Sequence, residues 1–360
     1  MRNLITRQEG RAIGDVRPFT PACQCSLTVL GAIPIIDGSR RSHPVIKRIF
    51  ATVLVLCALA GWLRAQAAKP GAPQTRIETP TQPTIIRVPV NLVNVPLTVT
   101  DQKNHLVINL TKDDFKIFED GKPQTIQYFS RETDLALRIG LLIDTSNSVR
   151  VRLSFEQQAA TEFLTDTIRR GKDRAFVVGF DGKPQLVQDY TDNLEKLANA
   201  IRGLRAGGVT SLFDAVYTSC KEKLLFFPPP EPYLRRVMIV ISDGEDNRSE
   251  HTRGEALSMA QRAEVTIFAI NTNRSGVEER GDIVLKSLSE KTGGRAFHDF
   301  QARDLAADFR VIGLDLRSQF LLSYISTNTA RDGTYRKIKI LLADKSLHIR
   351  AKSGYFAPSQ

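Results

Sequence analysis

Three oxygen-bearing side chains alternate along a short segment that follows an apolar run. Asp144, Ser146 and Ser148 stand two residues apart, directly after the mostly apolar run 137–143. Such a run is typical of a buried parallel strand, and ligand crevices open at the carboxyl ends of these strands. In an extended loop, alternate side chains can converge on one point. One carboxylate and two hydroxyls there would offer hard oxygen ligands to Mg²⁺, with Mn²⁺ or Ca²⁺ as alternatives.

Two later segments can complete this set of oxygens. Residues 207–210 form a glycine-rich loop that delivers the Thr210 hydroxyl before a helix, and residues 241–244 end another apolar run with Asp243. Two carboxylates cancel the charge of a divalent ion on paper. The other ligands are neutral hydroxyls, which reduce its attraction for anions very little. We therefore expect the ion to attract a further carboxylate from a partner.

The order of these residues resembles the metal-ion-dependent adhesion site of the von Willebrand factor A family. That site reads Asp-x-Ser-x-Ser, then a loop Thr, then a strand-end Asp followed by Gly. The matching positions are Asp144, Ser146, Ser148, Thr210 and Asp243. The resemblance implies that the two serines, and usually the threonine, touch the metal directly, while the aspartates often act through water. It also implies that a partner's Glu or Asp carboxylate fills the open position.

Simpler interpretations of the same residues are turns and helix caps, which Ser, Asp and Gly favour. Residues 144–146 also resemble the active-site triplet of aspartic proteases, but those enzymes need two facing aspartates, and no second Asp-Thr-Ser or Asp-Thr-Gly occurs. Three polar residues close to the proposed ligands in sequence are interpreted as supporting or solvated side chains. They are Asp214, Asp246 and Asn247.

Alternating strand and helix patterns over residues 135–310 predict a doubly wound, mostly parallel α/β sheet with helices on both faces, the fold of a von Willebrand factor A domain. Strands are expected at 137–143, 175–180, 237–241, 265–270 and 296–297. Helices are expected at 151–170, where Gly171 would be the stop, and at 194–204, 212–226, 283–288 and 304–316.

Both flanks of this region predict β-structure. Residues 85–130 alternate between apolar and polar, with a hairpin turn at 119–122 that 125–129 should close, and residues 318–357 alternate likewise. Each flank is short for a core of its own, so we expect the two to pack together as one small β-sandwich. Parts of both flanks resemble von Willebrand factor A-related proteins of acidobacteria. The stretches concerned are 99–124, 332–338 and 354–356.

The N-terminal region predicts export. Fifteen uncharged residues, 49–63, follow Lys47 and Arg48 and precede the small-x-small sequence at 65–67, as in a secretory signal. A membrane span needs about 20 residues. We therefore interpret 1–67 as a leader and signal peptide, with the true start possibly at Val45, and expect no membrane span after cleavage. The proline-rich residues 68–84 predict an extended linker.

Composition excludes several function classes. The net charge is +11, but no basic run is interleaved with aromatics, so a nucleic-acid partner is not expected. Gly-x-Ser-x-Gly, phosphate-loop and His-Glu-x-x-His motifs do not occur, and no two of the five histidines stand at ligand spacing. Signal cleavage would leave Cys220 as the single cysteine, with no internal disulfide.

The sequence thus predicts a non-enzymatic binding or adhesion module, exported to the periplasm or the extracellular side of the cell envelope. Its partner would be a protein or matrix ligand that offers a carboxylate to the metal. The alternative is a subunit, catalytic or not, of an envelope enzyme complex of the hydrolase or chelatase type.

Overall fold

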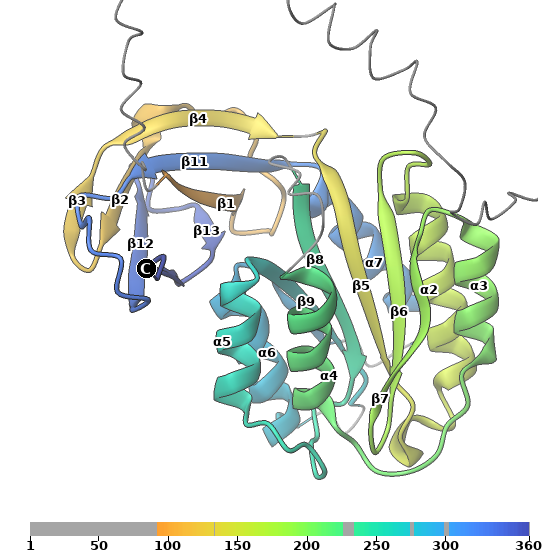
Figure 1. Cartoon of the computed structure of the whole chain (residues 1–360). Coiled ribbons are helices and arrows are strands. Elements are labelled where there is room, and N and C mark those ends of the chain that lie inside the picture. The colour runs from red at the N-terminus through yellow and green to blue at the C-terminus, as the bar shows by residue number, and fades with distance from the viewer. Residues whose placement is uncertain (1–91, 133, 226–233, 274–276, 299–301, 360) are drawn as a thin grey trace, which may run out of the picture. The chain divides into compact units, whose positions relative to one another are not determined.

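The computed structural model describes most of the chain from Leu92 onward (Figure 1). The residues outside the described part are 1–91, 133, 226–233, 274–276, 299–301 and 360. The predicted leader, signal peptide and linker, together with residues 85–91 of the first β segment, therefore lie outside it. Among the described helices, none is both long and apolar enough to cross a bilayer.

A six-stranded sheet with the order β10-β9-β8-β5-β6-β7 forms the centre of the α/β domain. Its strands are β5 (Ala136–Asp144), β6 (Arg174–Phe180), β7 (Pro184–Thr191), β8 (Leu234–Ser242), β9 (Val265–Asn271) and β10 (Ala296–His298). All neighbours pair in parallel except β7, which runs antiparallel to β6. The central strands are apolar along most of their length because helices cover both of their faces.

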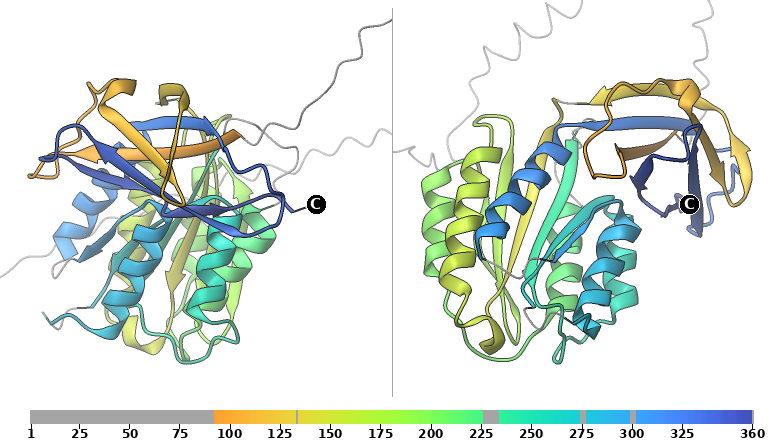
Figure 2. Two further views of the ribbon diagram at one scale, coloured as in Figure 1. Left: turned by 90° about the vertical axis from the view of Figure 1, so that its left-hand side faces the viewer. Right: turned by 180° about the vertical axis from the view of Figure 1, so that it is seen from behind.

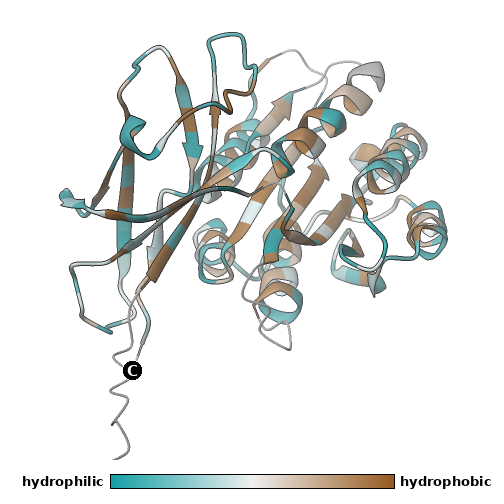
Figure 3. Ribbon diagram, turned by 90° about the horizontal axis from the view of Figure 1, so that it is seen from above, coloured by the Kyte–Doolittle hydropathy of each residue, from teal (hydrophilic) through white to brown (hydrophobic). Residues whose placement is uncertain are grey.

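Helices lie on both sides of this sheet (Figures 1 and 2). One side carries α2 (Leu153–Thr167), α3 (Leu194–Gly203) and α7 (Ala302–Leu316), and the other carries α4 (Leu212–Ser219), α5 (Arg253–Arg262) and α6 (Arg280–Thr292). Each side buries its own apolar cluster against the sheet. The helices mix hydrophobic and hydrophilic residues, whereas the central strands are mainly hydrophobic (Figure 3). The predicted doubly wound, mostly parallel fold is confirmed.

Several elements differ from the sequence prediction. Helix α5 was not predicted, although Thr252 and Glu255 form a capping box at its start. Strand β7 was not predicted either, because as an edge strand it is mostly exposed and lacks an apolar run. The helix expected at 212–226 ends as α4 at Ser219 and continues as a π-helical turn, Cys220–Leu224. Helix α2 ends at Thr167 rather than at Gly171.

The flanking segments form two four-stranded antiparallel sheets, with the orders β13-β1-β11-β4 and β14-β12-β2-β3. The strands are β1 (Leu92–Thr100), β2 (Phe115–Glu119), β3 (Lys122–Gln124), β4 (Ile126–Glu132), β11 (Gln319–Ile325), β12 (Tyr335–Leu342), β13 (His348–Ala351) and β14 (Gly354–Phe356). A short 3₁₀ turn, Lys112–Asp114, precedes β2. Each sheet contains strands from both segments, so the β domain is built from chain on both sides of the α/β domain.

One expectation for this domain is wrong. Residues 125–129 were expected to close the hairpin after the turn at 119–122, but β3 closes it by pairing with β2. Strand β4 instead crosses to the other sheet and pairs with β11. The crossing places Ile126 and Phe129 against the apolar cluster between the sheets, which explains their apolar character.

A buried ionic network joins the two β segments. Glu119, from the first segment, is 2% exposed and lies 3.5 Å from the guanidinium of Arg336, which is 1% exposed. The Glu119 carboxylate also accepts hydrogen bonds from the hydroxyls of Tyr324 (2.7 Å), Ser326 (2.6 Å) and Tyr355 (3.0 Å). Breaking a buried pair of this kind leaves an uncompensated charge, which costs about 3–5 kcal/mol. The network therefore holds the second segment in register with the first.

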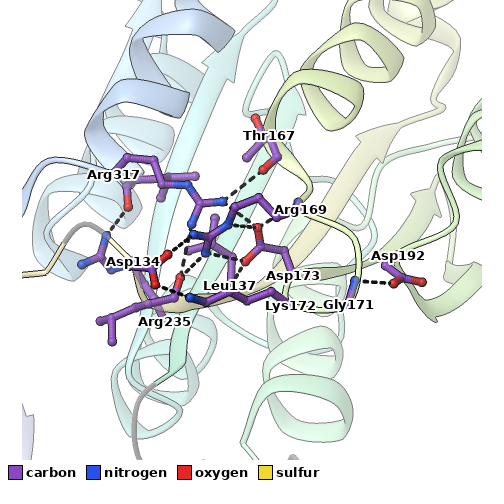
Figure 4. Close-up of polar contacts among 12 residues, drawn as sticks. Asp134, Leu137, Thr167, Arg169, Gly171, Lys172, Asp173, Asp192, Arg235 and Arg317 are labelled. Carbon is purple, nitrogen blue, oxygen red and sulfur yellow. Dashed lines mark hydrogen bonds and ion pairs between the residues drawn. The ribbon is translucent and has the colours of Figure 1, made fainter.

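A second network fastens the two chain crossings between the domains (Figure 4). Asp173, fully buried before β6, accepts from the Leu137 amide (2.8 Å), Arg169 Nε (2.9 Å) and Arg317 Nη2 (2.6 Å). Arg317 follows α7, whereas Leu135, whose carbonyl accepts from both Arg169 and Arg317, precedes β5. Burial alone would raise the pKa of Asp173, but hydrogen bonds from Arg169 and the Leu137 amide outweigh it and lower the pKa to about 2.

We predict that Asp173→Asn lowers the free energy of unfolding at pH 7 by about 2 kcal/mol. This is the stabilisation that follows from lowering the pKa of Asp173 from 3.8 in the unfolded chain to about 2 in the folded one. The unfolded carboxylate protonates near pH 4, so below that pH the unfolded state binds more protons. The wild type should therefore lose this advantage as the pH falls from about 4 to 2. Urea unfolding at several pH values measures the difference.

Asp192→Asn is the control, since Asp192 is partly exposed and accepts only the Gly171 amide at 2.8 Å in the same view (Figure 4). It should cost much less than Asp173→Asn at pH 7. Equal losses in the two variants, or a loss in Asp173→Asn that does not change with pH, would contradict this account of the junction.

Candidate metal site

The predicted ligands come from neighbouring strand ends at the carboxyl edge of the sheet. Asp144 is the last residue of β5, and Asp243 directly follows β8. The two strands pair in parallel with Ile143 opposite Ile241, so Asp144 and Ser242 lie side by side. Ser146 precedes a 3₁₀ turn, Asn147–Val149, that opens the loop after β5. The structure thus brings the two carboxylate-bearing segments to one point of the edge.

Asp144 is a fully buried carboxylate with neutral donors around it. Its Oδ1 accepts from the Ser146 amide at 2.8 Å, and its Oδ2 accepts from Ser242 Oγ at 2.7 Å. Burial raises the pKa of Asp144 to about 6, and the negative charge of Asp243 also raises it, against the hydrogen bonds from the two serines. A cation at this place would reverse both unfavourable effects.

The hydroxyls of Ser146 and Ser148 are adjacent. Their oxygens lie 2.9 Å apart, with Ser146 buried and Ser148 exposed. Neighbouring oxygen ligands of an octahedral Mg²⁺, each about 2.1 Å from the ion, stand about 3 Å apart. The pair therefore fits two positions of a magnesium coordination shell, and the exposed side leaves room for a ligand from solvent or a partner.

Backbone hydrogen bonds tie the Thr210 loop to both strand-end loops. The Asn147 amide donates to the Gly208 carbonyl at 3.2 Å, and the Gly207 amide donates to the Thr145 carbonyl at 2.7 Å. On the other side, the Thr210 amide donates to Asn247 Oδ1 at 3.0 Å, and the Asn247 amide donates back to the Thr210 carbonyl at 3.1 Å. Thr210 itself is buried. The third predicted segment is thus fixed between the other two.

The three polar residues predicted to support the site, Asp214, Asp246 and Asn247, accept hydrogen bonds from backbone amides. Asn247 holds the Thr210 loop, as described above. Asp246 Oδ2 accepts from the Phe213 amide at 2.9 Å, at the start of α4. Asp214 Oδ1 accepts from the His251 amide at 2.9 Å and lies 2.7 Å from His251 Nδ1. All three side chains therefore position loops around the site.

Ser242 belongs to the candidate site by its contacts, and the sequence reasoning missed it. Its hydroxyl donates to Asp144 and accepts from the Gly244 amide at 3.0 Å, so it links the two strand ends. The available signal was a polar residue at the end of an apolar strand that pairs with the strand of Asp144. Gly244 has φ +78°, and a Cβ there would lie 2.2 Å from the Gly281 carbonyl oxygen. The start of α6 therefore packs directly against this loop.

The donor set is rich in hydroxyls rather than carboxylates. Within the described ranges, no cluster of three or more His, Cys, Asp or Glu side chains is placed to hold a metal. A site at this edge would consist of two carboxylates and three hydroxyls, which suits a hard divalent cation and does not suit a soft one.

Comparisons with known proteins found one family model and several solved structures to which this chain is similar. Residues 139–245 match the family model for the von Willebrand factor type A domain. Curated proteins give no match. The chain is similar to proximal thread matrix protein 1 of the mussel byssus, in a form with a zinc-occupied MIDAS motif, at 18% identity and a TM-score of 0.43, over 55% of this chain and 49% of that one.

Two bacterial structures are also similar. One is BatB from Bacteroides thetaiotaomicron, at 15% identity and a TM-score of 0.41, covering 51% of this chain and 100% of that one. The other is the vWF domain of the type V pili tip protein Mfa5 from Porphyromonas gingivalis, at 13% identity and a TM-score of 0.41, covering 50% and 94%. At these identities and scores, no residue role is transferred to this chain.

Two serine variants distinguish a residue that stabilises the site without metal, Ser242, from a proposed metal ligand, Ser148. We predict that Ser242→Ala destabilises the metal-free protein by about 1–3 kcal/mol, because Asp144 loses a donor and the Gly244 amide loses its acceptor. Ser148→Ala removes an exposed hydroxyl that is bonded to Ser146 Oγ, so it should cost about 1 kcal/mol or less without metal, yet it should weaken stabilisation by Mg²⁺. Thermal unfolding with chelator and with Mg²⁺ measures both. A full Mg²⁺ response in Ser148→Ala would exclude this residue as a ligand.

Proposed function

We propose that this chain, whose residues 139–245 are a von Willebrand factor type A domain, binds one divalent cation at the carboxyl edge of its sheet and captures a partner through it. The proposed ligands are Asp144, Ser146, Ser148, Thr210 and Asp243, with Mg²⁺ as the first candidate and Mn²⁺ or Ca²⁺ as alternatives. The observation that carries the proposal is the buried Asp144 carboxylate, with neutral hydrogen-bond donors and two adjacent serine hydroxyls beside it.

The donor chemistry explains why such a site would bind a partner. When bound, the cation supplies a positive charge that the neutral hydroxyls of Ser146 and Ser148 do not quench. Because Ser148 is exposed, an incoming carboxylate could reach a cation bound there from this side. A Glu or Asp side chain of a protein or matrix ligand has the charge and the oxygen ligands that this position favours. The proposal assigns binding to the site and no bond-breaking step.

Export of the chain would determine the cellular compartment in which it binds its partner. If the apolar segment 49–63 is a cleaved signal, as the sequence predicts, the partner is a component of the periplasm or of the cell exterior. Adhesion to a protein or matrix ligand is then the function that the site favours.

Metal binding should be visible as stabilisation. An ion that binds only the folded state adds about 2.7 kcal/mol at a hundredfold excess over its dissociation constant, which raises Tm by about 5 °C or more for a chain of this size. We predict this rise for the wild type and its loss in Asp243→Ala. Glu245→Ala, an exposed carboxylate in the same loop, is the matched control and should keep the rise. No response of the wild type to millimolar Mg²⁺, Mn²⁺ or Ca²⁺ would overturn the proposal.

Partner capture tests the second half of the proposal. The immobilised exported chain should retain a specific protein from an envelope extract in Mg²⁺ and release it with chelator. Asp243→Ala should not retain it, while Glu245→Ala should. Replacing one Glu or Asp of the captured protein by its amide should abolish retention. A partner retained equally with chelator, or by Asp243→Ala, would show that binding does not pass through the metal.

A further inference from the structure

A cavity of about 740 Å³ lies between the β domain and the base of the α/β domain. One wall is the sheet of β1, β11 and β4, and the other includes the first residues of β8 and the turn from α5 to β9. Because β8 enters here and ends at the metal site, the cavity lies at the opposite edge of the central sheet. Its volume is in the range of small-molecule sites, about 300–1,000 Å³, which often form between domains.

The wall on the β domain combines polar residues, Asn94, Ser130 and Ser323, with more apolar surface than an outer sheet face normally carries. Leu92, Pro96 and Leu321 line the cavity, and they alternate along β1 and β11 with residues that enter the sandwich core. Tyr128 of β4 stands on the same wall and is 65% exposed, while Leu92 is 44% exposed. Leu234 faces them from the start of β8. The fold alone gives no reason for this apolar surface.

The polar side of the cavity carries an excess of positive charge. Lys352 Nζ lies 3.3 Å and Arg236 Nη1 3.7 Å from the carboxylate of Glu264, so two cations share one anion. Among the described residues, the buried Nε of Arg236 finds no hydrogen-bond partner. Buried donors are almost always paired in proteins, so an acceptor is expected there.

Glu264 occupies an unusual position. It follows α5 with φ +52°, a left-handed conformation that usually belongs to glycine at this place. Lys352 holds the pKa of Glu264 below its usual range, so the carboxylate is ionised. A side chain is thus kept at a backbone position that disfavours it, and it aligns the two cations along the cavity.

We propose that this cavity binds an amphipathic carboxylate, with its charged group at Arg236 and Lys352 and its apolar body against Leu92, Tyr128 and Leu321. A single carboxylate balances the excess charge and offers the acceptor that Arg236 Nε lacks. An apolar body of medium length covers the apolar wall. The site is independent of the metal and of its proposed partner.

The test uses decanoate and its uncharged analogue decanol, titrated into the exported chain, residues 68–360, by calorimetry. Decanoate should bind one to one, and decanol at least about tenfold more weakly. Arg236→Gln should lower the affinity for decanoate about tenfold and leave that for decanol unchanged. Tyr128→Ser, at an exposed position that tolerates substitution, should weaken both ligands. Asp144→Ala should bind decanoate like the wild type.

Arg202→Gln is the matched control, because this exposed arginine on α3 donates its side-chain hydrogen bond to Asn199 and lies outside the cavity. It should leave the affinity for decanoate unchanged. The absence of saturable binding would overturn the proposal. So would equal affinity for decanoate and decanol, or binding that neither Arg236→Gln nor Tyr128→Ser alters, since such binding would be adsorption elsewhere.

Discussion

The burial of one carboxylate, Asp144, is the constraint on which the candidate metal-binding edge of this protein depends. A charge with no exposure to water is costly unless its surroundings compensate it. Here the compensation comes from a hydroxyl on the neighbouring strand, Ser242, and from the backbone of the following loop. These neutral donors leave the pKa of Asp144 raised to about 6. A divalent cation is the group that would complete the compensation.

The surrounding loops are held by hydrogen bonds. The Thr210 loop is bonded on one side to the loop after β5 and on the other to Asn247. Such bonds would give the proposed metal ligands the fixed positions that a coordination shell needs. Further from the edge, the Asp173 cluster closes the junction with the β domain, and the Glu119–Arg336 pair closes the β domain itself. Neutral hydrogen bonds thus fix the loops at the edge, and ionic networks fix the junction and the β domain.

Much of this could be predicted from the sequence, and the reasons are physical. Buried parallel strands are continuous apolar runs, so β5 and β8 were identifiable, and the polar residues after them had to lie at one edge. Strand β7 was missed because an exposed edge strand has no such run. Helix α5 was missed because the residues it buries fully are the small Ala256 and Ala260, with Leu257 and Met259 only partly buried. The crossing of β4 to the other sheet was not predictable, because local alternation does not specify which strand is the partner.

The role of Ser242 was hidden for a related reason. Its contact with Asp144 spans 98 positions of sequence and depends on the register of β5 against β8, which no local pattern encodes. Asn247 likewise acts on a loop 37 positions away. The residue types predicted for the site follow from local chemistry, whereas the residues that support them follow from the fold.

The most direct test of the central claim is a crystal structure of residues 68–360 grown with Mn²⁺, with anomalous differences measured at the manganese edge. This account predicts one strong peak within coordination distance of Ser146 Oγ and Ser148 Oγ, beside Asp144 and Asp243. A map from well-ordered crystals at millimolar Mn²⁺ without a peak there, or with peaks only elsewhere, would contradict it.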